Sequence, residues 1–107
     1  MIDSRDRAFR LEQDLRRLVP IAKRLANKAG AAGINVGNLR RAADNAGLIL
    51  ASSAPRYRSI VYGQVMRRAG LIPTGRIVRT PRVLGGNRVD VWVSPAFVAS
   101  SQRRHVA

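Results

Sequence analysis

The hydrophobic period of this chain changes once, at Pro73, and that change limits the folds open to it. Before Pro73, apolar residues recur at the three- and four-residue spacing of helices. After it they alternate with polar residues, as Val89, Val91 and Val93 do, and Gly85–Asn87 marks a turn. The pattern predicts a mainly α protein with a small β-hairpin, an α+β fold. An apolar share of 46% suits a folded domain.

The first helix is predicted over roughly Ser4–Ala29, from an apolar stripe whose members are spaced alternately by three and four residues. The stripe consists of Ala8, Leu11, Leu15, Leu18, Ala22, Leu25 and Ala29. Pro20 lacks a backbone donor and clashes with the preceding turn, so we expect a long kinked helix or two helices meeting there. The stripe either packs on its own domain or forms a dimeric coiled coil. Its three alanines favour packing within the domain.

Two further helices are predicted over about Val36–Ala46 and Arg56–Ala69. Asn35 is a suitable N-cap for the first of them, and each helix is followed by Gly-Leu-Ile, a typical C-terminal cap. Candidate strands follow at Arg76–Thr80 and Arg88–Ser94, with a short strand near residues 34–36. The predicted units are therefore a bracing or dimerising helix (1–30), a central domain (31–95) and a flexible basic tail (96–107).

The third helix is predicted to have one buried and one exposed face. At 100° per residue, Val61, Tyr62, Val65 and Ala69 cluster on the inner side. The opposite side carries Arg56, Ser59, Ile60, Gly63, Gln64 and Arg67. A glycine in the middle of a helix costs about 1 kcal/mol relative to alanine. Gly63 therefore implies either close approach of DNA or another helix packed tightly against it.

Positive charge dominates the second half of the chain. Between Asp44 and Asp90 there are eight arginines and no acidic residue, and the whole chain carries a net charge of +14. Such a surface repels itself unless a polyanion covers it, and DNA is the obvious candidate. Arginine outnumbers lysine eighteen to two, which suits phosphate and guanine recognition but also follows from a GC-rich genome.

The candidate DNA-binding residues divide by the contact that each side chain can make. Gln64 and Arg67 are suited to base edges, because glutamine pairs with adenine and arginine with guanine through two hydrogen bonds. Ser59 and Gly63 lie on the same helical face. The remaining candidates are arginines expected to contact phosphates from the third helix or from the hairpin, namely Arg56, Arg58, Arg68, Arg76, Arg79, Arg82 and Arg88. Trp92 either stacks on a base or, as we favour, fills the core.

The order of three helices and a basic hairpin is the layout of a winged helix-turn-helix domain. Residues 36–43, 47–49 and 61–72 resemble small winged helix-turn-helix proteins of actinobacterial phages and their hosts. Tyr62-Gly63 stands where that family has Trp-Gly, and Met66 where an aromatic residue is usual. The resemblance covers about Ile34–Val93. It implies a winged helix and nucleic-acid binding more than a defined biological task.

Several function classes find little support. The chain has no cysteine and one histidine, His105, three residues from its end, and no Walker-type or dinucleotide-binding loop. We therefore expect no enzyme activity, cofactor, metal site or small-molecule substrate. No membrane segment or export signal is evident, so a cytoplasmic protein is expected.

Double-stranded DNA is the expected partner, bound by a transcriptional regulator or a phage or mobile-element factor. Two alternatives remain open: a protein-interaction module that binds an acidic host protein, and an RNA-binding protein. A homodimer is compatible with either.

Overall fold

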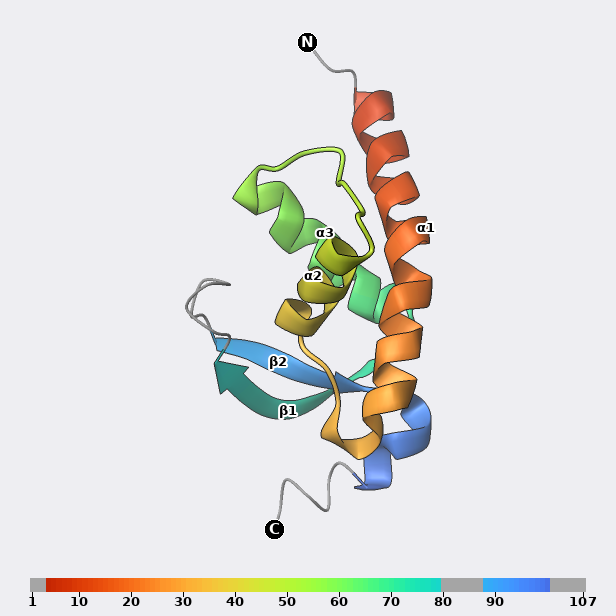
Figure 1. The fold of residues 1–107 in the computed structure, drawn as a ribbon, viewed down its shortest axis with the longest axis vertical. Coiled ribbons are helices and arrows are strands. Elements are labelled where there is room, and N and C mark those ends of the chain that lie inside the picture. The colour runs from red at the N-terminus through yellow and green to blue at the C-terminus, as the bar shows by residue number, and fades with distance from the viewer. Residues whose placement is uncertain (1–3, 80–87, 101–107) are drawn as a thin grey trace.

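The computed structural model describes residues 4–79 and 88–100 of the chain. Its elements, in chain order, are helix α1 (Ser4–Ala29), the 3-10 turn η1 (Gly30–Ala32), helices α2 (Val36–Asn45) and α3 (Pro55–Arg68), strands β1 (Ile72–Arg79) and β2 (Arg88–Val93), and the 3-10 turn η3 (Pro95–Phe97). Helix α1 runs along one side of the molecule, with α2, α3 and the hairpin beside it (Figure 1). The predicted α+β fold, mainly helical with an antiparallel hairpin, is confirmed.

Helix α1 is continuous through Pro20. Leu15, Leu18 and Ala22 from the predicted stripe are buried, so the stripe packs on the rest of its own domain. Those side chains are therefore not available to a coiled-coil partner. The first turns of α1 are exposed, and Phe9 keeps 63% of its surface accessible.

Local capping sets the ends of α2 and α3. Asn35 accepts a hydrogen bond from the amide of Asn38, and the Asn38 side chain accepts one from the amide of Asn35, which makes a reciprocal capping box. Both helices end in the same motif, with Gly47 at φ 71° and Gly70 at φ 75°. In each case the amide after the glycine bonds back to the carbonyl five residues earlier, at 3.0 and 3.1 Å.

The hairpin is longer on its first strand than the alternation predicted. β1 begins at Ile72, directly after the α3 cap, and pairs antiparallel with β2 from Ile72–Val93 to Arg79–Arg88. The register is irregular between Pro73 and Ile77, where Gly75 has φ 82°. The predicted turn at 85–87 lies outside the described residues. The three alternating valines of β2 differ in burial, because Val91 and Val93 are buried and Val89 is half-buried.

The connection between α1 and α2 is fastened to the hairpin. Ile34 and Trp92 exchange two backbone hydrogen bonds, both 2.8 Å long, in an isolated antiparallel bridge. Gly33 makes this approach feasible, because a Cβ there would lie 2.7 Å from the Trp92 carbonyl oxygen and 2.6 Å from Val91 Cγ1. The short strand expected near residues 34–36 is thus a single bridge.

A buried carboxylate joins α1 to the segment that leads into α3. Asp14 is 4% exposed and accepts hydrogen bonds from the Ala51 amide (3.0 Å) and the Tyr57 hydroxyl (2.5 Å). Burial, with Asp14 beside it, raises the pKa of Tyr57, so the phenol stays protonated and donates at neutral pH. The loop between α2 and α3 is therefore held in place by α1.

The chain after β2 does not begin as the loose tail that the sequence predicted. Pro95–Phe97 forms the 3-10 turn η3, and Phe97 is half-buried beside Gly30, where a Cβ would lie 3.6 Å from its ring. The packing of an aromatic ring against a glycine explains why this part of the expected tail is structured. The basic residues 103–104 lie outside the described part of the chain.

Candidate nucleic-acid interface

Helix α3 presents the two faces that its sequence predicts. Val61, Tyr62, Val65 and Met66 are buried against the core. The predicted outer residues are all exposed: Arg56, Ser59, Ile60, Gly63, Gln64 and Arg67. The helix therefore offers a mixed polar and apolar face to a partner, with its core side fully occupied.

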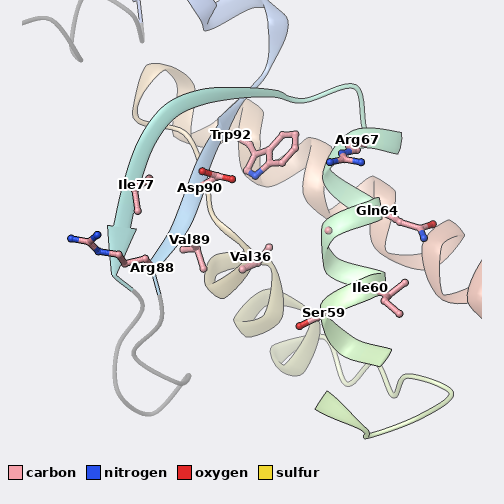
Figure 2. Close-up of a pocket in the computed structure, with 11 residues that line it drawn as sticks. Val36, Ser59, Ile60, Gln64, Arg67, Ile77, Arg88, Val89, Asp90 and Trp92 are labelled. Carbon is pink, nitrogen blue, oxygen red and sulfur yellow. The ribbon is translucent and has the colours of Figure 1, made fainter. Parts of the chain in front are cut away.

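A groove of about 570 Å³ separates this face of α3 from the hairpin (Figure 2). Ser59, Ile60, Gly63, Gln64 and Arg67 line it from α3. The opposite wall comes from the hairpin and from the start of α2, through Ile77, Arg88, Val89, Asp90, Trp92 and Val36. Five of the sequence-predicted residues thus meet at one groove: Ser59, Gly63, Gln64, Arg67 and Arg88.

Gly63 lies open on the wall of this groove. A Cβ placed there meets no atom within 4 Å among the described residues. Within the described residues no helix packs closely against Gly63, so that part of the chain gives no support to one of the two explanations for this glycine. Glycine is unfavourable inside a helix, and among the described residues no packing contact requires it at this exposed position.

The charges in the groove are mixed but mainly positive. Arg67 and Arg88 line it together with the carboxylate of Asp90. Arg88, Asp90 and Trp92 alternate with the valines of β2, so the period of two directs all three toward the same face. An anion entering the groove meets two guanidinium groups and one carboxylate.

Several predicted phosphate contacts are engaged inside the protein. Arg68 pairs with Glu12 on α1 at 2.7 Å, and this hydrogen bond is the main reason that the pKa of Glu12 lies below its usual value. Arg76 donates to the carbonyl oxygens of Ala31 and Ala32 at 2.9 and 3.3 Å, which ties the hairpin to the turn η1 that follows α1. Neither side chain lines the groove.

The other predicted arginines lie elsewhere. Arg56 is exposed in the first turn of α3, and Arg79 is exposed at the end of β1. Arg58 faces a second hollow, between α2 and α3. Arg82 lies outside the described residues. The structure therefore divides the predicted set among the groove, the interior contacts and the outer surface.

Sequence reasoning missed the apolar part of the groove. Val36, Ile77 and Val89 line it, and Ile77 keeps 58% of its surface exposed. Trp92 packs partly against the core and partly lines the groove, so its assignment to the core was right only in part. The signal for Val89 was present in the alternation of β2, but its distance from Ile60 depends on how the hairpin folds back.

The described part of the chain was found to hold neither a cluster of metal-ligand side chains nor a helix of membrane-spanning character. Among residues 4–79 and 88–100, no three His, Asp or Glu side chains gather as metal ligands would. No helix within those ranges is long and apolar enough to cross a membrane. Comparison with protein-family models, curated proteins and solved structures gave no match.

Proposed function

We propose that this protein binds double-stranded DNA as a winged helix-turn-helix domain. In this proposal α3 enters the major groove, and the β1–β2 hairpin lies against the adjacent backbone. The order of the elements supports this proposal, because three helices precede the hairpin. The backbone bridge between Ile34 and Trp92 joins the segment before α2 to that hairpin. A transcriptional regulator or a phage or mobile-element DNA-binding factor fits this activity.

The observation that carries the proposal is the outer face of α3. Gln64 and Arg67 are exposed there beside Gly63, where an added Cβ would meet no atom within 4 Å among the described residues. A helix with glutamine and arginine side chains pairs with adenine and guanine edges, and an open glycine lets its backbone approach the groove closely. Arg56, Arg79 and Arg88 supply positive charge around that face, which suits phosphate contacts.

The test is binding to a random duplex of about 30 base pairs and to its single strand, for the protein and two variants. Arg67→Ala removes a groove arginine, whereas Arg24→Ala removes the same charge from an exposed position on α1. Losing one charge-assisted contact costs about 1.5–3 kcal/mol. We expect Arg67→Ala to weaken duplex binding about tenfold or more and Arg24→Ala to weaken it much less.

Equal losses in the two variants would mean that only net charge attracts the duplex. A preference for the single strand, or for RNA in direct competition, would favour RNA binding instead. No binding of the duplex at low salt would contradict the proposal.

A protein-interaction module is the second candidate, and the apolar lining of the groove favours it. Ile60, Ile77 and Trp92 are among the residues that line the groove. Desolvated apolar and aromatic groups are typical of the centre of protein interfaces. If an acidic protein is the partner, Ile60→Ser abolishes its capture while Gln64→Ala leaves it unchanged. If DNA is the partner, Gln64→Ala weakens duplex binding more than Ile60→Ser does.

A further inference from the structure

A second hollow lies behind α3, between α2, the α2–α3 loop and the first half of α3. Its volume is about 280 Å³. The polar groups that line it are Arg40, Asp44, Ser52, Ser53, Arg58 and Tyr62. At 100° per residue, Arg58 lies about 140° around α3 from Gly63. This hollow is therefore separate from the groove described above.

Two guanidinium groups reach the hollow from different helices. Arg40 belongs to α2 and Arg58 to α3, and both are half-buried. Within the described part of the chain, neither side chain has a carboxylate within ion-pairing distance, and Asp44 is the one acidic residue in the lining. The hollow thus carries one net positive charge.

The charged groups of the hollow affect the pKa of the Tyr62 hydroxyl. Burial raises the pKa of Tyr62, and the Asp44 carboxylate raises it further, while Arg40 and Arg58 act in the opposite direction. Arg40, Asp44 and Arg58 line the same hollow as Tyr62, whose hydroxyl stays protonated at neutral pH and can donate.

The loop that completes the hollow is fixed before any ligand arrives. Asp14 holds Ala51, and Arg17 donates to the Ile49 carbonyl at 3.4 Å. Ser52 Oγ accepts a hydrogen bond from the Ala54 amide at 3.1 Å, which leaves the Ser52 hydroxyl hydrogen for an acceptor in the hollow. A loop held in this way loses little entropy when it binds.

We propose that this hollow binds a phosphate group. Arg40 and Arg58 supply forked donors that match phosphate oxygens, and the Ser52, Ser53 and Tyr62 hydroxyls supply further donors. The phosphate belongs either to the DNA backbone or to a small phosphorylated molecule. The site does not depend on the function proposed for the groove, because it uses other residues.

The first measurement is an amide NMR titration of the full chain with inorganic phosphate, at constant ionic strength set by chloride. Saturable shifts are expected at Ser52, Ser53 and Tyr62, and Arg58→Gln and Arg40→Gln should each weaken the fitted affinity about tenfold. Arg24→Gln is the matched control and should leave it unchanged.

Asp44→Asn provides a test that a misfolded variant cannot mimic. Removing the one carboxylate from the hollow should tighten phosphate binding, since a like charge no longer opposes the anion. The proposal is overturned if the shifts do not saturate, if they spread evenly over the basic surface, or if Arg58→Gln and Arg24→Gln behave alike.

A titration with duplex DNA identifies the source of the phosphate. If the duplex displaces inorganic phosphate from the hollow, a backbone phosphate occupies the site. If the duplex-bound protein still takes up phosphate, a small phosphorylated molecule is the ligand. If the protein binds phosphate but no duplex, the site stands and the DNA-binding proposal falls.

Discussion

Two glycines, Gly63 and Gly33, differ in how closely the rest of the chain surrounds them. Around Gly63 there is open space, whereas a Cβ on Gly33 would lie within 3 Å of Val91 and Trp92 atoms. Gly33 also has φ 74°, in the left-handed region that other residues avoid, and Gly63 sits in a regular helix. Contacts within the described structure therefore require glycine at position 33, where the hairpin approaches, but not at position 63.

Replacing Gly63 should change the stability of the protein and its affinity for duplex DNA in opposite directions. Gly63→Ala is expected to stabilise the free protein by about 0.5–1 kcal/mol, because alanine is the better helix residue and nothing obstructs its methyl group. If DNA approaches this backbone closely, the same change should weaken duplex binding about tenfold. Urea unfolding and fluorescence anisotropy measure the two effects. Unchanged duplex affinity would show that the partner does not approach α3 at this position.

Replacing Gly33 should be costly to the fold. Gly33→Ala combines left-handed strain with contact against the hairpin, so we expect a loss of about 2–4 kcal/mol. Gly47→Ala is the control and should cost about 1–2 kcal/mol, because Gly47 has φ 71° but an added Cβ would meet no atom within 4 Å in the described structure. If urea unfolding shows equal losses of stability for the two variants, the hairpin moves to accommodate the methyl group at position 33.

At the scale of elements, α1 organises the packing of the other segments through polar contacts as well as apolar ones. Glu12 pairs with Arg68 at the end of α3, and Asp14 fixes the loop before α3. These two carboxylates of α1 thus hold both ends of the helix that we propose enters DNA.

The Asp14 anchor can be tested by deleting one hydroxyl group. Tyr57→Phe removes the donor to the buried Asp14 and should lower the free energy of unfolding by about 1–2 kcal/mol. Tyr62→Phe is the matched control, because the described structure gives the Tyr62 hydroxyl no hydrogen bond, and should change stability little. Amide exchange should also quicken at Ala51 in the first variant alone. If exchange at Ala51 is unaltered, Asp14 holds the loop without Tyr57.

At the scale of the whole molecule, positive charge is concentrated where acidic residues are missing. The chain carries +14, and its stretch without carboxylates, from Asn45 to Val89, includes all of α3 and β1. Two arginines of this stretch, Arg68 and Arg76, make contacts within the protein. Among the described residues of this stretch, Arg56, Arg67 and Arg79 are exposed, which suits attraction of an anionic partner.

The salt dependence of duplex binding should depend on the exposed arginines and not on those that make contacts within the protein. If three or four arginines contact phosphates, the log–log slope of affinity against salt should be about −3 to −4, since each contact contributes about −0.9. Arg79→Gln should reduce the slope by about one unit. Arg76→Gln should instead lower stability, because its guanidinium bonds Ala31 and Ala32. The reverse pattern would place Arg76 on the DNA and remove Arg79 from it.

Sequence alone determined the features that depend on near neighbours along the chain. The capping of α2 by Asn35, the two glycine terminators and the inner and outer faces of α3 all follow from residues within a turn or two, and the structure confirms them. Of the three valines that alternate along β2, Val91 and Val93 lie in the core and Val89 is half-buried. Short-range hydrogen bonds and helical or strand periodicity are sufficient to set such features.

Tertiary structure alone decided which arginines are available and what the groove contains. Arg68 and Arg76 look like their neighbours in sequence, yet their partners lie 56 and 45 residues away. Ile77, Val89 and Trp92 line the same groove as α3 because the hairpin folds back toward that helix. Asp14 is buried where the loop before α3 bonds to it. The physical reason is that local periodicity orients a side chain relative to its own element. Whether that direction meets a carboxylate, a carbonyl or solvent depends on where distant elements pack.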